Sequence, residues 1–122
     1  MPVHFVLARY LPGFEEYGDL YEAIKTGKKT SEYRDATPYW AKRLLNNQGL
    51  QEYNQILENN KDNHIPTCVR YRFDLSELKH TEATFRVGYT QGPTLHATIR
   101  EIHWKPTEEQ FEVCIEDVRE TP

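Results

Sequence analysis

The chain has 122 residues and a formal net charge of −4, and 38% of its residues are hydrophobic. This length is enough for one continuous hydrophobic core but not for two, so we expect a single domain over residues 1–122. No stretch approaches the roughly 20 apolar residues of a membrane span, and the N-terminal region lacks a small-residue cleavage site. We therefore expect an intracellular protein, in the cytoplasm or the nucleus.

The first predicted elements are a strand and a helix. Residues 3–9 form a mostly apolar, β-favouring run, which predicts a strand buried on both faces. Asp19 and Glu22 form a capping-box-like pair that opens a helix, and Gly27 ends it. The inner stripe of this helix is predicted to consist of Leu20, Ala23 and Ile24.

The next predicted elements are a short strand and two helices. Residues 30–34 alternate in polarity and fit a strand, and Thr37-Pro38 is an N-cap followed by a first-turn proline. Trp40 lies on the inner face of the helix that follows and is predicted to belong to the core. Residues 46–66 are polar and predict an excursion from the main fold. A helix within it has an inner face of Leu50, Tyr53, Ile56 and Leu57.

The second half of the chain alternates hydrophobic and polar residues, which predicts antiparallel strands. The inward side chains are expected to be Val69, Tyr71, Phe73, Phe85, Val87, Tyr89, Leu95, Ala97, Ile99, Ile102, Trp104, Phe111, Val113 and Ile115. The hydrophobic parity changes after Ile99, so we expect a β-bulge near Arg100 and Glu101. These elements predict an α+β fold, a small, partly closed β-barrel of about five to six mostly antiparallel strands with flanking helices.

The cysteines and histidines show no metal-site spacing. Cys68 and Cys114 are too few and too far apart for a disulfide framework, and we expect both to be reduced core thiols. The five histidines form neither an H-x-H nor an H-E-x-x-H motif, so we predict no metal and no cofactor. They are His4, His64, His80, His96 and His103.

The charge is unevenly distributed. Residues 25–43 carry a local charge of +4, and the rest of the chain carries −8. Such a distribution favours one basic face for a polyanion, while the remaining surface repels it. The cations of this segment are Lys25, Lys28, Lys29, Arg34, Lys42 and Arg43.

A short charged motif lies where the first helix meets the second strand. Gly27, Lys29, Glu32 and Arg34 spell G-x-K-x-x-E-x-R. This motif and the order of predicted elements resemble the ASCH domain (activating signal cointegrator homology) family of the PUA-like superfamily, over most of the chain except residues 46–66. The resemblance implies a PUA-like barrel that binds RNA or a modified nucleoside in a cleft floored by the charged motif residues.

The residue types at this motif are suited to ligand binding. A Lys-Glu-Arg cluster can hold a phosphate or polarise a base carbonyl, although the same cluster can also serve as a structural ion network. Strand alternation places Thr30, Glu32 and Arg34 on one face, with Lys29 at its edge. An aromatic residue beside a cation in the next helix can stack on an unpaired base. The predicted ligand-binding residues are Gly27, Lys28, Lys29, Glu32, Arg34, Tyr39 and Arg43.

Two alternative functions remain open from the sequence. The first is a metal-independent hydrolase. ASCH relatives that resemble bacterial N4-acetylcytidine amidohydrolases use the motif lysine, a threonine three residues later and a glutamate from a later strand. Other relatives act as ribonucleases. Here Glu32 stands where that threonine would be. The catalytic candidates are Lys29, Thr30, Ser31 and Glu32, with Glu82 or Glu101 as the later-strand carboxylate. The second alternative is a protein-interaction module that docks a partner through residues 46–66.

Overall fold

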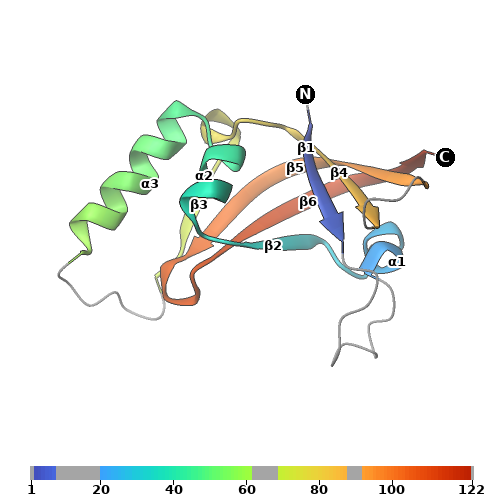
Figure 1. Cartoon of the computed structure of the whole chain (residues 1–122), viewed down its shortest axis with the longest axis horizontal. Coiled ribbons are helices and arrows are strands. Elements are labelled where there is room, and N and C mark those ends of the chain that lie inside the picture. Colours follow the sequence, from blue (N-terminus) through green and yellow to red (C-terminus); the bar gives the residue numbers. More distant parts are fainter. Residues whose placement is uncertain (1, 8–19, 62–68, 88–91, 122) are drawn as a thin grey trace.

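The computed structural model describes residues 2–7, 20–61, 69–87 and 92–121 (Figure 1). The strands are β1 (Val3–Leu7), β2 (Ser31–Asp35), β3 (Tyr71–Phe73), β4 (Glu82–Val87), β5 (Thr94–Lys105) and β6 (Gln110–Thr121). The helices are α1 (Leu20–Lys25), α2 (Pro38–Leu44) and α3 (Asn47–Asn59), together with the 3-10 turns η2 (Leu75–Glu77) and η3 (Pro106–Glu108). None of the described helices is long and apolar enough to cross a membrane.

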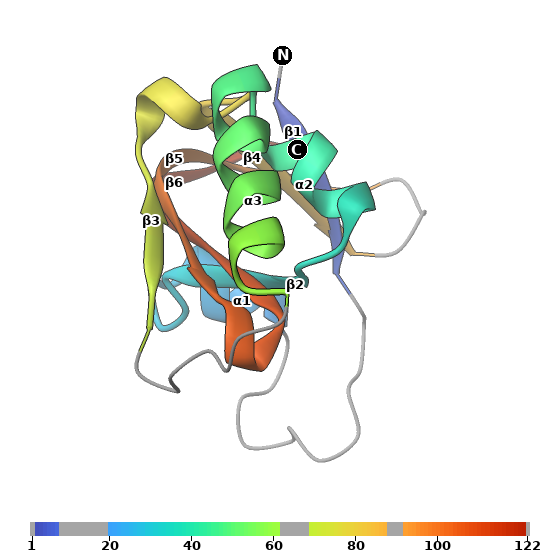
Figure 2. The ribbon, with the colours of Figure 1, turned by 90° about the vertical axis from the view of Figure 1, so that its left-hand side faces the viewer.

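The strands form one curled sheet. Its order is β1-β4-β5-β6-β2, and β3 pairs with β5 beside this path. β1 and β4 run parallel, whereas the other described strand pairs are antiparallel. The long strands β5 and β6 curve through the middle of the molecule, and α2 and α3 lie on one side of the sheet (Figures 1 and 2). The α+β prediction and its mostly antiparallel, partly closed, barrel-like sheet are therefore confirmed.

Residue alternation gives this sheet an apolar inner face. The buried core includes Phe5, Phe73, Phe85, Leu95, Ile99, Ile102, Trp104, Phe111 and Val113. Helix α3 packs onto this face, because the ring centroid of Tyr53 lies 4.7 Å from that of Trp104. Residues 47–59 therefore contribute to the core, which the prediction of an excursion did not foresee.

A β-bulge at Arg100 changes which residues face the core. Ile99 pairs with Ile115, and Glu101 pairs with Cys114, so Arg100 is the extra residue. Because one residue is added, Glu101 and His103 point outward where an unbroken alternation would turn them inward. The bulge expected from the sequence is confirmed.

The helix signals at Gly27 and Thr37 are also confirmed. Gly27 follows α1 with φ of 82°, the left-handed conformation in which glycine commonly ends a helix. The Thr37 hydroxyl accepts a hydrogen bond from the backbone nitrogen of Trp40, which caps α2. Trp40 is half-buried and packs against the core, with its ring stacked 5.6 Å from that of Phe5.

Three expectations about burial were wrong. β1 buries one face only, because Val3, Phe5 and Leu7 are buried while the residues between them are exposed. This pattern follows from a curled sheet that has helices on its inner side. Leu57 is 43% exposed, because it points off the stripe by which α3 meets the sheet. In α1 the buried positions include Tyr21, which was not predicted, whereas Leu20 is only partly buried.

Some predictions fall on residues that the structure does not describe. They are the Asp19 cap, the end of the first strand at residues 8–9, the Cys68 thiol, the Tyr89 strand position and the end of the 46–66 segment.

Candidate functional site

β2 turns the charged motif residues towards the inner side of the sheet. Glu32 is 6% exposed and pairs in register with the buried Val113, whereas Ser31 and Tyr33 face outward. The ammonium of Lys29 lies 3.5 Å from Oε2 of Glu32, and Nε of Arg34 lies 3.9 Å from Oε1 of the same carboxylate. A buried carboxylate is thus held between two cations, and Glu32 and Arg34 share one face of β2, as the strand alternation predicted.

Arg34 makes contacts that no sequence pattern indicated. Its guanidinium lies over the rings of Phe5 and Trp40, 5.1 Å from each centroid. Its Nη2 donates a hydrogen bond of 3.2 Å to the carbonyl oxygen of Val6. The Nε atom is buried and has no hydrogen-bond partner among the described residues. Arg34 therefore joins the ion cluster to the aromatic residues of β1 and α2.

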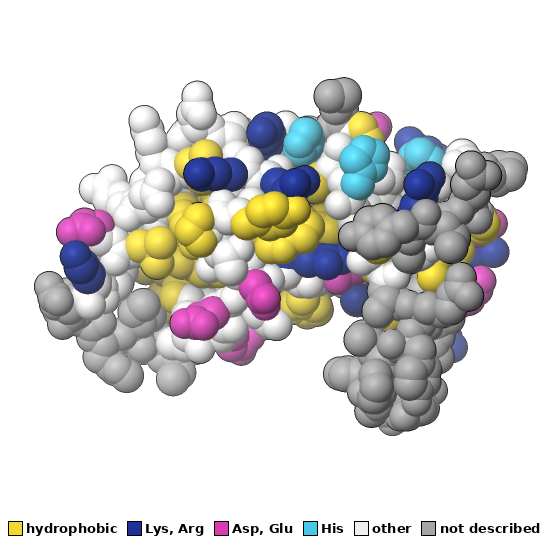
Figure 3. All heavy atoms as spheres, in the orientation of Figure 1, with side chains coloured by type: hydrophobic (Ala, Val, Ile, Leu, Met, Phe, Trp, Pro, Cys, Tyr) yellow, Lys and Arg dark blue, Asp and Glu magenta, His cyan; other side chains and the backbone are white. Residues whose placement is uncertain are grey.

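The aromatic contacts continue to the surface along α2. Tyr39 is 58% exposed and meets Trp40 edge-on, with ring centroids 5.4 Å apart. The guanidinium of Arg43 lies 4.3 Å from the centroid of the Tyr39 ring. On the face that carries α2, hydrophobic side chains and Lys or Arg side chains lie side by side (Figure 3). Here we define the binding row as Lys29, Glu32, Arg34, Trp40, Tyr39 and Arg43.

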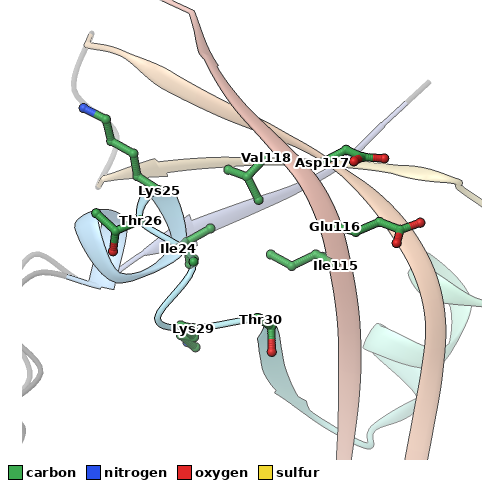
Figure 4. Close-up of a pocket in the computed structure, with 10 residues that line it drawn as sticks. Ile24, Lys25, Thr26, Lys29, Thr30, Ile115, Glu116, Asp117 and Val118 are labelled. Atoms are coloured by element: carbon green, nitrogen blue, oxygen red, sulfur yellow. The ribbon is translucent and has the colours of Figure 1, made fainter.

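A pocket of about 370 Å³ opens beside the Lys29 end of this row. Its walls come from the end of α1, from the linker to β2 and from the kinked part of β6 (Figure 4). The apolar lining consists of Ile24, Ile115 and Val118. The polar and charged lining consists of Lys25, Thr26, Gly27, Lys29, Thr30, Glu116 and Asp117. Lys29 is the residue that the pocket and the binding row share.

Only some of the remaining predicted residues lie at the pocket. Gly27 and Thr30 line the pocket, whereas Lys28 is exposed and is not among the lining residues. The Ser31 hydroxyl is on the outer face, where it donates a 2.8 Å hydrogen bond to Oε2 of Glu112. Thr30 is therefore the hydroxyl of the motif that lies on the pocket side.

Neither proposed later-strand carboxylate accompanies Lys29. Glu82 is exposed on β4 beside Arg119, at 4.0 Å. Glu101 lies on the outer face, bound to Arg72 and paired in register with Cys114. The carboxylates that line the pocket are instead Glu116 and Asp117. Sequence reasoning missed both, because a second irregularity of the β5–β6 ladder sets their direction.

That irregularity shapes the pocket wall. Thr98 pairs with Glu116 and His96 pairs with Arg119, so β6 carries one more residue here than β5. Asp117 adopts a positive φ of 52°, which is uncommon for a residue other than glycine. Bulges of this kind bend a strand and redirect its side chains, and they are frequent next to functional sites.

Comparisons with protein-family models, with curated proteins and with solved structures gave no match to this chain.

Proposed function

We propose that this chain binds an unpaired nucleotide of RNA or a nucleoside-like molecule, with the base in the pocket beside Lys29. The observation that carries the proposal is the position of Lys29. Its side chain is 24% exposed, it lines a pocket of about 370 Å³, and it contacts the buried Glu32. That volume lies within the range of small-molecule sites, which is roughly 300–1,000 Å³.

The lining of the pocket suits a base better than a phosphate. Ile24, Ile115 and Val118 offer apolar contact to the flat faces of a ring. Glu116 and Asp117 belong to the lining, and Figure 4 shows their carboxylates pointing away from Ile24, so they place negative charge beside the pocket, which would repel a phosphate. The ammonium of Lys29 can donate to a base carbonyl.

The binding row supports an RNA strand that continues beyond the pocket. Stacking of bases on aromatic rings and on guanidinium planes is the usual mode of recognition for unpaired RNA. Tyr39 and Arg43 are both exposed and already stacked on one another, so they offer such a platform. The row reaches this platform from Lys29 through Glu32, Arg34 and Trp40 in a series of direct contacts.

Binding is favoured over hydrolysis by the position of the motif groups. The Ser31 hydroxyl lies on the outer face, and neither Glu82 nor Glu101 lies beside Lys29. The arrangement of lysine, hydroxyl and later-strand carboxylate is therefore not assembled among these residues. Incubation with N4-acetylcytidine checks this preference, since product formation would favour the hydrolase alternative.

Titration of labelled single-stranded RNA at several salt concentrations, together with calorimetry of free nucleosides, tests the proposal. We expect weak RNA binding that declines as salt rises, because phosphate neutralisation releases counterions and most of the chain is acidic. Binding of nucleosides that does not depend on salt would restrict the site to the pocket. No binding of either ligand at low salt would contradict the proposal.

A further inference from the structure

The outer face of the sheet holds a second cluster of chemically reactive side chains. Glu101 and His103 are two residues apart on β5, and Cys114 lies opposite Glu101 on β6. The candidate donor atoms of these three residues lie within 4.8 Å of one another. The bulge at Arg100 produces this arrangement, because it turns Glu101 and His103 to the face that Cys114 occupies.

The His103 ring is the most polar group of this cluster that lacks hydrogen bonds to the described residues. Both of its ring nitrogens are buried, and neither has a hydrogen-bond partner among the described residues. Nε2 lies 3.3 Å from Oε1 of Glu101, and this contact is an ion pair only when the imidazole is protonated. A buried polar atom without a partner costs free energy, so a ring with two such atoms calls for an explanation.

We propose that Glu101, His103 and Cys114 form a zinc-binding site on the outer face of the sheet. Thiolate, imidazole and carboxylate are the protein ligands that Zn²⁺ uses. Three protein ligands would leave a fourth position for water or another donor. The donors of a tetrahedral zinc site lie about 3.3–3.8 Å apart, so these side chains would close in by about 1 Å.

The neighbouring charges are compatible with such a site. Glu101 uses Oε2 to bind Arg72, while Oε1 faces His103 and would be the atom that binds the metal. Arg72 would then orient the carboxylate from behind, as outer groups commonly do at metal sites. The nearby Arg100, whose Nε lies 3.8 Å from Oε1, would have to turn away.

Cys114 supplies the soft ligand. The thiol is 6% exposed and forms no disulfide, its Sγ accepts a 3.9 Å hydrogen bond from the Ser31 hydroxyl, and burial raises its pKa. A metal that binds sulfur displaces the thiol proton and so offsets this effect. The ligands come from two strands, so their spacing in the sequence predicted no metal, and only the β5–β6 register brings them together.

Cobalt(II) titration of the full chain under reducing conditions tests the site, because a thiolate bound to cobalt gives a charge-transfer band in the near ultraviolet. We expect one equivalent of cobalt to produce the band and Zn²⁺ to bleach it. Cys114→Ser should abolish the band, whereas Cys68→Ser, the matched control for the other thiol, should keep it. His103→Ala and Glu101→Gln should weaken binding by at least about tenfold.

Several outcomes would overturn the site. No band in the unmodified chain would do so, as would a band that survives Cys114→Ser or that disappears with Cys68→Ser alone. Circular dichroism of each variant excludes loss of the fold as the cause. Should Cys114→Ser fail to fold, His103→Ala decides the question, because unchanged cobalt affinity in that variant contradicts a histidine ligand.

Discussion

Nη2 of Arg34 donates a hydrogen bond to the carbonyl oxygen of Val6, and this contact connects β2 to β1, the strands at the two ends of the sheet path. The guanidinium also lies over Phe5 and Trp40. One motif side chain therefore spans the open side of the curled sheet. Arg34 thus combines a structural role with its place in the binding row.

Arg34→Met should lower the free energy of unfolding by about 1–3 kcal/mol, because it removes this hydrogen bond and the contacts with two rings. Arg34→Lys should recover only part of the loss, since an ammonium lacks the planar fork. Urea denaturation measures both. The control is Arg43→Met, an exposed cation over one ring, which should change stability by less than about 0.5 kcal/mol. An equal loss of stability in Arg34→Met and Arg43→Met would show that the contact of Arg34 with β1 does not stabilise the fold.

Gly49→Ala tests whether α3 belongs to the core. A Cβ at this position would lie 2.4 Å from the carbonyl oxygen of Glu77 and 3.0 Å from Cβ of Leu45. We expect a loss of about 1–3 kcal/mol in the free energy of unfolding, because the backbone at Glu77 must move to make room for the new methyl group. Gly92→Ala is the control, since a Cβ there meets nothing within 4 Å. If both variants unfold at the same urea concentration, Gly49 does not pack closely against Glu77 and Leu45.

Glu77 should make stability depend on pH. Burial, and then the nearby Glu52 carboxyl, raise the pKa of Glu77 from 4.5 to about 7. The folded chain therefore binds this proton more tightly than the unfolded chain, and ionisation opposes folding increasingly from pH 4.5 to pH 7. Unfolding free energy should thus be higher at pH 5 than at pH 8, by on the order of 1–3 kcal/mol.

Denaturation curves of Glu77→Gln at the two pH values check this contribution. The variant should lose most of the difference, because an amide does not ionise. Glu58→Gln, which changes an exposed carboxylate of α3, should retain it. An unchanged pH difference in Glu77→Gln would assign the effect to other groups.

Tyr39 and Tyr33 provide a matched pair for the binding row. Both tyrosines are exposed, but Tyr39 belongs to the row on α2, whereas Tyr33 lies on the outer face of β2. Tyr39→Ala should weaken binding of single-stranded RNA by about 1–3 kcal/mol, the usual contribution of one stacked base. Tyr33→Ala should leave it unchanged. Fluorescence anisotropy with a labelled oligonucleotide distinguishes them, and equal affinities would remove Tyr39 from the interface.

Local patterns predicted the local structure well. The Thr37 cap, the turn at Gly27 and the bulge at Arg100 each depend on a few adjacent residues, and all three are present. The placement of Glu32 and Arg34 on the same face of β2 followed from strand alternation.

Contacts between distant segments could not be predicted in this way. The contact of Arg34 with Val6 depends on the order of the strands, in which the parallel pairing of β1 with β4 leaves β1 at one end. The direction of Glu116 and Asp117 depends on an irregularity in the pairing of β5 with β6. The cluster of Glu101 with Cys114 likewise depends on the register of two strands.

The affinity and stability of Lys29→Ala test the central proposal most directly, with Lys61→Ala, an exposed lysine in the turn after α3, as the control of equal charge. Ligand titration and urea denaturation are measured on both variants. We predict that Lys29→Ala loses RNA or nucleoside binding by at least about tenfold while stability changes by less than about 1 kcal/mol, as for a partly exposed ion pair. Lys61→Ala should leave nucleoside binding unchanged. Unchanged binding in Lys29→Ala would contradict the proposal, and a stability loss of about 3 kcal/mol beside it would make the contact of Lys29 with the buried Glu32 purely structural.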